Sequence, residues 1–155
     1  MKTKLLGVFA AAALLAACES TPDQSAAGAG QTSGGPRPGS QEDLVVNVGD
    51  RVFFDFDRYD VRADGRPTLQ RQAEWLQRYN TVNVQVAGHT DERGTREYNL
   101  ALGQRRANAA RDFLVAQGVS GARVSTISYG KDRPIALGSN EEAWAQNRVA
   151  ITSVR

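Results

Sequence analysis

The sequence predicts an α/β fold, an α+β sandwich in which one sheet is covered by two main helices. Two observations lead to this prediction. From residue 44 to residue 155, segments with strand periodicity alternate with segments with helix periodicity, and no internal repeat occurs. A chain of 155 residues also has the length of one domain with tails.

The first half of this region predicts a strand, a helix and a second strand. Residues 52–56 are mostly β-branched and aromatic, which is typical of a strand. Pro67 suits the first turn of a helix. The apolar positions of that helix recur at helical spacing and are Leu69, Ala73 and Leu76. Valines alternate with polar residues over 82–86 and predict a half-buried strand.

The second half predicts a long helix, a strand, a short helix and a last strand. Thr95 has the side chain of an N-cap, and Gly118 suits the position that follows a helix end, so the long helix extends to Gln117. The remaining elements are a strand at 124–129, a helix at 141–145 and a strand at 149–154.

The N-terminal segment has the pattern of an export signal. Lys2 and Lys4 precede an apolar run of 13 residues at 5–17. As a helix this run would span about 20 Å, which is too short for a hydrocarbon core of about 30 Å. Small residues stand directly before Cys18, as in the lipobox of bacterial lipoproteins. We therefore predict a cleaved signal peptide at 1–17 and a lipid on Cys18; an ordinary signal peptidase site is the alternative.

The segment at 18–43 predicts a flexible linker. After Cys18 it contains no Val, Ile, Leu, Met or aromatic residue, so it cannot bury enough apolar surface to offset its ordering entropy. As a flexible chain it would reach about 28 Å on average. The predicted domain then occupies residues 44–155.

Composition excludes several classes of function. Residues 44–155 hold 16 basic and 13 acidic side chains, a balance that argues against a nucleic-acid-binding protein. One cysteine excludes an intrachain disulfide, and one histidine excludes a metal site with two imidazoles. No cofactor is expected.

One charge interrupts the apolar stripe of the long helix. Helical spacing places Arg106 in a stripe formed by Tyr98, Leu102, Ala109, Phe113 and Ala116. A buried guanidinium requires an anion. Asp91 or Glu92, in the loop before the helix, would supply it as an internal ion pair. Alternatively, Arg106 and Asp91 would bind the carboxylate and the ammonium of a ligand.

Several spaced motifs resemble the OmpA-like peptidoglycan-binding domain family. The motifs are FDFDRYD at 54–60, GHTDERG at 88–94, EYN at 97–99, LGQRRANA at 102–109 and SYGK at 128–131. The resemblance covers essentially all of 44–155. It implies a βαβαβ(α)β order, with one mixed four-stranded sheet packed against two main helices.

The resemblance also implies a ligand and a site. Asp91 and Arg106 would bind the zwitterionic side chain of diaminopimelate in the stem peptide of peptidoglycan. The other residues implied to line the pocket are Phe56, Asp57, Thr90, Asn99 and Leu102. The expected molecule is a non-catalytic outer-membrane lipoprotein, held at Cys18 on the periplasmic face of a Gram-negative bacterium. It would tether the membrane to the cell wall and support envelope integrity and cell division, with a TolB-type β-propeller and other Tol proteins as partners.

Two other functions are alternatives, a cell-wall hydrolase and a pure protein–protein adaptor. Hydrolysis would need two converging carboxyls, whereas the adjacent Asp91 and Glu92 are expected to point apart. His89 next to Asp91 lacks the Gly-x-Ser-x-Gly motif of a Ser-His-Asp hydrolase. Asp55, Asp57 and Asp60 do not have the spacing of an EF-hand calcium loop, so no metal is expected.

Overall fold

The computed structural model describes residues 35–155. The predicted signal peptide at 1–17, Cys18 and most of the predicted linker lie outside the described residues. Within the described part of the chain, no helix is long and apolar enough to cross a bilayer.

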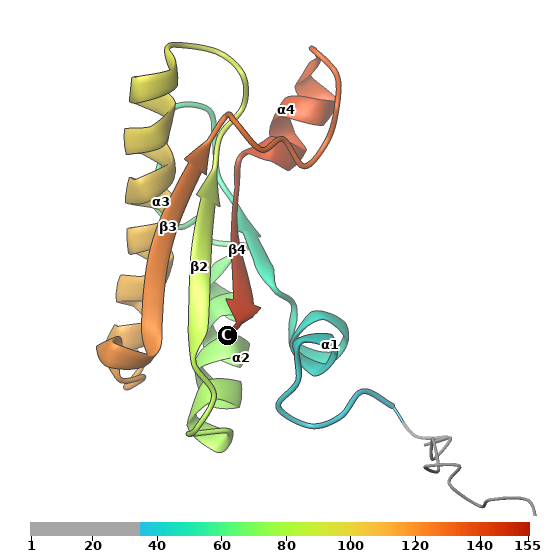
Figure 1. Ribbon diagram of the computed structural model, residues 1–155, viewed down its shortest axis with the longest axis vertical. Helices are drawn as coiled ribbons and strands as arrows, with labels where there is room; N and C mark the ends of the chain where they lie inside the picture. The colour runs from blue at the N-terminus through green and yellow to red at the C-terminus, as the bar shows by residue number, and fades with distance from the viewer. Residues whose placement is uncertain (1–34) are drawn as a thin grey trace, which may run out of the picture. The chain divides into compact units, whose positions relative to one another are not determined.

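One four-stranded mixed sheet forms the centre of the fold (Figure 1). Its strands are β1 (Arg51–Phe53), β2 (Val84–His89), β3 (Val124–Gly130) and β4 (Val149–Val154). The strand order is β1-β4-β2-β3. β2 runs parallel to β3, whereas β4 runs antiparallel to both β1 and β2. The predicted mixed sheet is confirmed.

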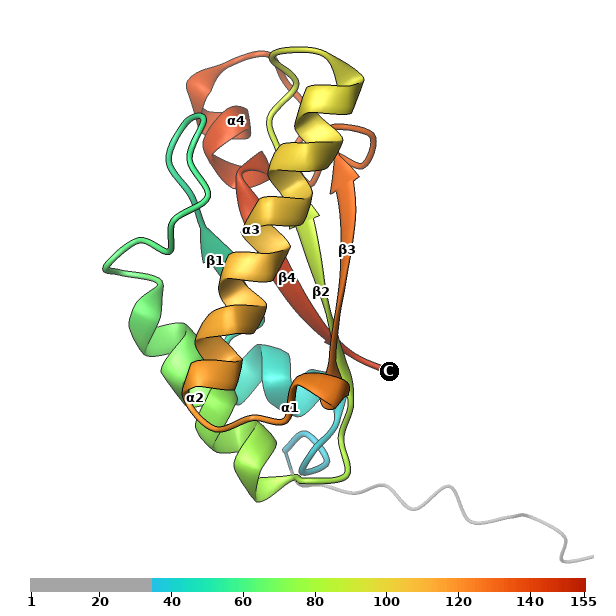
Figure 2. The same ribbon diagram turned by 90° about the vertical axis from the view of Figure 1, so that its left-hand side faces the viewer.

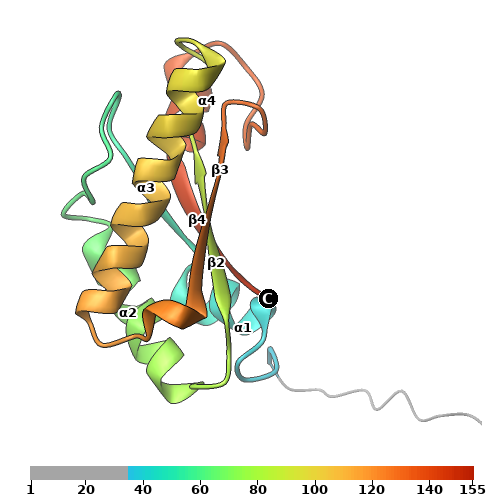
Figure 3. The same ribbon diagram turned by 60° about the vertical axis from the view of Figure 1, so that its left-hand side comes forward.

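Two helices cover the same face of the sheet (Figures 2 and 3). They are α2 (Arg66–Arg78), with a proline in its first turn, and α3 (Arg96–Ala116), whose N-cap Thr95 accepts a hydrogen bond from the Tyr98 amide at 3.2 Å. The short helix α4 (Glu141–Asn147) lies near the end of the sheet where β2 and β3 finish (Figure 1). The predicted helices are therefore confirmed, with ends that differ by a few residues.

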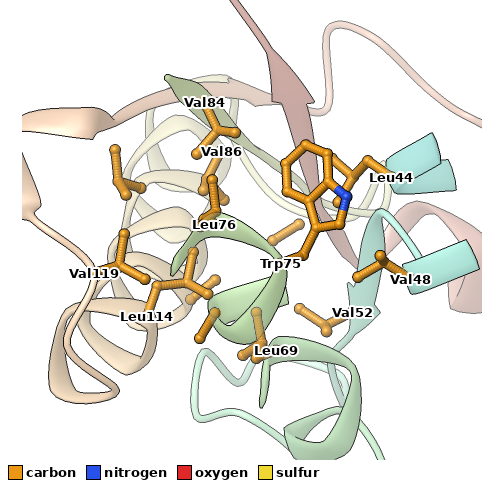
Figure 4. Packing of buried hydrophobic residues seen from close by; sticks show 14 of the residues in the cluster. Leu44, Val48, Val52, Leu69, Trp75, Leu76, Val84, Val86, Leu114 and Val119 are labelled. Carbon is orange, nitrogen blue, oxygen red and sulfur yellow. The ribbon is translucent and has the colours of Figure 1, made fainter. Parts of the chain in front are cut away.

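The hydrophobic core lies between these two helices and the sheet (Figure 4). Side chains from both helices and all four strands fill it, among them Leu69 and Leu76 of α2, Leu114 of α3, and Val84 and Val86 of β2. Full burial of such a side chain stabilises the fold by about 1.5–3 kcal/mol. The predicted inner faces of α2 and β2 are thus correct.

The buried face of α3 differs from the predicted stripe. Leu102 and Arg106 are buried, but Tyr98 and Ala116 are exposed and Ala109 and Phe113 are half-buried. The sheet instead packs against small residues of the helix, among them Gly103. A Cβ atom on Gly88 of β2 would lie 1.8 Å from the carbonyl oxygen of Gly103, so helix and strand meet backbone to backbone. Glycine adds nothing to an apolar stripe. The predicted stripe was wrong for the exposed Tyr98 and Ala116, whereas the half-buried Phe113 packs against the core.

The domain begins before residue 44. Ser40 caps a single turn, α1 (Gln41–Asp43), which continues as the π-helical turn η1 (Leu44–Val48). Buried Asp43 accepts hydrogen bonds at 2.8 Å from the indole of Trp75 and from the amide of Gly39. Residues 40–43, assigned to the linker on composition, therefore pack as part of the domain, because one buried carboxylate joins them to α2.

Candidate binding pocket

A pocket of about 210 Å³ lies where the parallel strands β2 and β3 end and α3 begins. Its walls are formed by Phe56, Asp57, Thr90, Asp91, Arg93, Gly94, Tyr98, Asn99, Leu102 and Arg106. All seven predicted site residues are among them. The structure therefore brings together residues from three separate segments, the loop after β1, the loop after β2, and α3.

Local structure fixes each of these segments. Asp57 has a φ of +57°, the only positive φ of a non-glycine residue among residues 35–155, and this turns the loop after β1 over the pocket. The Tyr98 hydroxyl donates a hydrogen bond to the Asp57 carboxylate. The Asn99 side chain donates to the carbonyls of Arg93 and Thr95 at 2.9 Å. Asn99 therefore holds the loop against the first turn of α3.

Arg106 is a buried cation held by backbone carbonyls. It is 1% exposed, and its guanidinium donates to the carbonyl oxygens of Arg58 at 2.8 Å, His89 at 2.9 Å and Asp55 at 3.1 Å. The predicted internal ion pair with Asp91 or Glu92 is wrong, since Arg106 forms no ion pair with any described residue and Asp91 pairs with other arginines. Burial lowers the pKa of Arg106 to about 10, and the nearby charge of Asp91 offsets only part of this effect.

Asp91 is a buried carboxylate with two cationic partners. It is 4% exposed and forms ion pairs with Arg93 at 2.7 Å and Arg148 at 3.4 Å. The Arg93 amide donates a further hydrogen bond at 3.1 Å. Burial by itself would raise the pKa of Asp91, but the bonds from Arg93, with a smaller contribution from Arg148, outweigh it and lower the pKa below its ordinary value. Asp91 is therefore ionised at neutral pH.

Arg93 lies between two aromatic rings at the rim of the pocket. Its guanidinium carbon is 3.9 Å from the ring centre of Phe56 and 4.1 Å from that of Trp144. The Trp144 indole in turn donates to the Glu92 carboxylate at 3.0 Å. Helix α4 therefore supports the loop after β2 from the side.

Thr90 supplies an unpaired hydroxyl. The side chain is 2% exposed, and its Oγ1 is the only buried side-chain nitrogen or oxygen without a hydrogen-bond partner in the described part of the chain. A buried hydroxyl without a partner costs free energy. A polar ligand group in the pocket would remove that cost.

A family model described as "OmpA family" matches residues 53–148, which is more than half of the chain. The chain belongs to the OmpA family. The family resemblance inferred from the sequence motifs is confirmed.

Relatives of this OmpA-family chain include lipoproteins. A peptidoglycan-associated lipoprotein of Rhizobium meliloti is 54% identical over 140 residues, which cover 89% of this chain and 80% of that protein. A crystal structure of the peptidoglycan-associated lipoprotein from Burkholderia pseudomallei is 42% identical, with a TM-score of 0.69, and covers 73% of this chain and 100% of its own. The structure of the cell wall anchor of the T6SS from Pseudomonas aeruginosa is 26% identical, with a TM-score of 0.59. The match covers 76% of this chain and 99% of that chain.

Sequence reasoning missed part of this OmpA-family pocket. Arg93, Gly94 and Tyr98 also line it, although they lie in or beside the motifs that carried the resemblance. Trp144 contacts Arg93 and Arg148 contacts Asp91, although both lie more than 50 residues further along the chain than the loop after β2. No local sequence pattern predicts these two contacts. These contacts form only when α4 and β4 fold back beside the end of β2.

The acidic residues after β1 of this OmpA-family domain form ion pairs. Asp60 pairs with Arg58 at 2.8 Å and Asp55 with Arg62 at 3.1 Å. Over residues 35–155, no three His, Cys, Asp or Glu side chains gather in a way that would hold a metal ion.

His89 is a buried residue at the end of β2. Its Nδ1 lies 2.9 Å from the carbonyl oxygen of Arg133, and burial lowers the pKa of the His89 ring.

Proposed function

We propose that this chain is a non-catalytic outer-membrane lipoprotein that binds peptidoglycan non-covalently. The OmpA-family match and relatives named peptidoglycan-associated lipoprotein support the proposal. The pocket would receive the zwitterionic end of diaminopimelate in the stem peptide. Lipid on Cys18 would hold the protein in the outer membrane, and the Tol-Pal system, with its TolB-type β-propeller, would supply its protein partners during cell division.

The observation that carries the proposal is the buried charge of Arg106. A guanidinium has five N–H donors, and backbone carbonyls occupy three donor atoms of Arg106 without neutralising its charge. A ligand carboxylate would supply the missing anion and accept charge-assisted hydrogen bonds. Each such bond contributes about 1.5–3 kcal/mol.

The acidic side of the pocket suits an ammonium group. Asp91 is ionised, and Asp57 adds a second carboxylate to the lining of the pocket. The ligand ammonium would approach Asp91 beside Arg93, whose side chain lies at the rim of the pocket and is 33% exposed. The Thr90 hydroxyl would pair with the same ligand end. Opposite charges in the lining of one pocket would thereby match a zwitterion rather than a simple anion.

Sedimentation with isolated sacculi tests the proposal. The purified full-length chain is expected to pellet with sacculi. Arg106→Lys, which keeps a charge but loses the planar fork, should bind at least about tenfold more weakly. The matched control is Arg105→Met, an exposed neighbour whose guanidinium carbon lies 5.4 Å from the Tyr59 ring centre, which should pellet like the unaltered chain.

Three outcomes would contradict the proposal. An unaltered chain that stays in the supernatant would favour the pure adaptor. Release of soluble muropeptides during prolonged incubation would favour a hydrolase. Equal sedimentation of the unaltered chain and Arg106→Lys would show that the wall binds elsewhere on the molecule.

A further inference from the structure

Arg148 joins three segments around the pocket without lining it. It lies between α4 and β4, and its side chain is 8% exposed. The guanidinium donates to the Phe54 carbonyl oxygen at 3.2 Å and to the Glu141 carboxylate at 2.6 Å, and forms the ion pair with Asp91 at 3.4 Å. One side chain therefore connects the end of β1, the loop after β2 and the start of α4.

Two of these contacts fix parts of the pocket. Phe54 stands directly before Asp55, whose carbonyl oxygen accepts a hydrogen bond from Arg106, and two residues before Phe56. Arg148 and Arg106 thus hold neighbouring carbonyls of one short segment, while Arg148 also holds Asp91. The position of Asp91 relative to Arg106 therefore depends on the contacts that both arginines make with the segment at Phe54 and Asp55.

The charge of Arg148 also matters to Asp91. Among the described residues, Asp91 has ion pairs with only Arg93 and Arg148. The Arg93 side chain is 33% exposed and lies where a ligand cation would approach. The Arg148 side chain is only 8% exposed, so its ion pair with Asp91 is enclosed by protein, whereas that of Arg93 lies at the rim of the pocket. A buried carboxylate left without an ion pair would be strongly unfavourable.

We propose that Arg148 is a positioning residue for ligand binding, which holds Asp91 and the segment 54–57 in the arrangement that receives a diaminopimelate-containing peptide. The inference rests on the proposed function of the pocket. Rigid support of this kind typically changes affinity by about 10–100-fold when it is removed from a metal site, and a zwitterion site makes similar demands on geometry.

A second arginine in the same chain provides a matched control. Arg123 donates to the carbonyl oxygens of Leu76, Tyr79 and Val82 at 2.7–3.0 Å, at the opposite end of the domain. Arg123→Met therefore removes a comparable set of backbone contacts without touching the pocket. A variant that weakens binding only by loosening the fold should behave like Arg123→Met.

The experiment titrates the full-length chain with a soluble tetrapeptide that contains meso-diaminopimelate, at a temperature where circular dichroism shows every variant folded. Arg148→Met is expected to bind at least about tenfold more weakly, with Arg123→Met unchanged. Arg148→Lys keeps the cation but cannot reach all three partners, and should lie between them. By NMR of the free protein, the pKa of the Asp91 carboxyl should rise in Arg148→Met and stay unchanged in Arg123→Met.

The outcomes separate this inference from the proposed function. A normal affinity in Arg148→Met, or equal losses in Arg148→Met and Arg123→Met, overturns the positioning role while peptide binding by the unaltered chain stands. Failure of the unaltered chain to bind overturns both. If Arg148→Met does not fold, Arg148→Lys decides, because an affinity and an Asp91 pKa equal to those of the unaltered chain would overturn the inference.

Discussion

Arg106 differs from most buried arginines because backbone carbonyls rather than a carboxylate surround its charge. This arrangement leaves the charge without a counter-ion among the described residues, at a cost in desolvation that the fold tolerates. The sequence placed Arg106 on a buried face and left two anions open for it; the internal ion pair with Asp91 or Glu92 is wrong, and the ligand carboxylate stays a prediction. Helical spacing determines the face of a residue, whereas its partners depend on how loops from other elements close over that face.

Replacement of Thr90 by valine should separate stability from binding. The hydroxyl has no partner in the described part of the chain, so Thr90→Val should leave the free energy of unfolding unchanged or raise it by about 1 kcal/mol. Binding of the diaminopimelate-containing peptide should become less favourable by about 0.5–1.5 kcal/mol in binding free energy. Urea denaturation and calorimetric titration measure the two quantities.

Thr152→Val is the control for this replacement, since the buried Thr152 hydroxyl pairs with the Gln72 side-chain oxygen at 2.9 Å. It should lose about 1 kcal/mol of stability without losing affinity. Equal destabilisation in the two valine variants would mean that Thr90 has an internal partner after all.

Asp91 should make stability depend on pH in the acid range. Its pKa in the folded protein lies below the unfolded value of about 3.9. The stabilisation of the fold by ionised Asp91 is therefore complete above the unfolded pKa, and it is lost as the pH falls through the folded pKa. Chemical denaturation of the chain and of Asp91→Asn should give a stability difference that is constant near neutral pH and shrinks below about pH 4. A difference that stays constant down to pH 2 would contradict the ion pairs of Asp91.

At the scale of elements, the contact between α3 and β2 determines where the pocket forms. Gly88 and Gly103 let the two backbones touch, which brings the first turns of α3 close to the carboxyl end of β2. Periodicity predicted both elements, because alternating valines and a capped helix are local signals. Periodicity did not predict which face of α3 contacts β2, because glycine residues do not contribute to a pattern of apolar side chains.

Gly88→Ala should destabilise the domain strongly. The new methyl group would lie 1.8 Å from a backbone carbonyl that cannot move without the whole helix. We expect a loss of about 3 kcal/mol or more in urea unfolding. Gly35→Ala, where nothing lies within 4 Å of the new Cβ, should be neutral. Similar unfolding midpoints for both variants would contradict the close contact.

At the scale of the whole domain, the start of the described chain and the pocket lie at opposite ends of the sheet (Figure 1). The chain enters beside α1, where Asp43 joins it to Trp75, and the pocket lies where β2 ends near α4. The motifs after β1 and around α3 were enough to predict seven pocket residues, but the distant support from α4 and β4 required the folded chain.

The membrane attachment is tested by Cys18→Ser in cells. The lipid is predicted to sit on this thiol, so its loss should move the protein from the membrane fraction to the soluble periplasm. Fractionation followed by immunoblotting measures the distribution. An unchanged membrane fraction would contradict the predicted lipoprotein, while leaving the pocket account intact.

The most direct test of the central claim, that Arg106 binds the ligand carboxylate, compares two peptides by calorimetry. One contains meso-diaminopimelate, and the other contains lysine, which keeps the ammonium but lacks the terminal carboxylate. The unaltered chain should prefer the first peptide by at least about tenfold, which corresponds to about 1.4 kcal/mol, and Arg106→Lys should lose most of this preference. Equal affinity of the unaltered chain for both peptides would contradict the account.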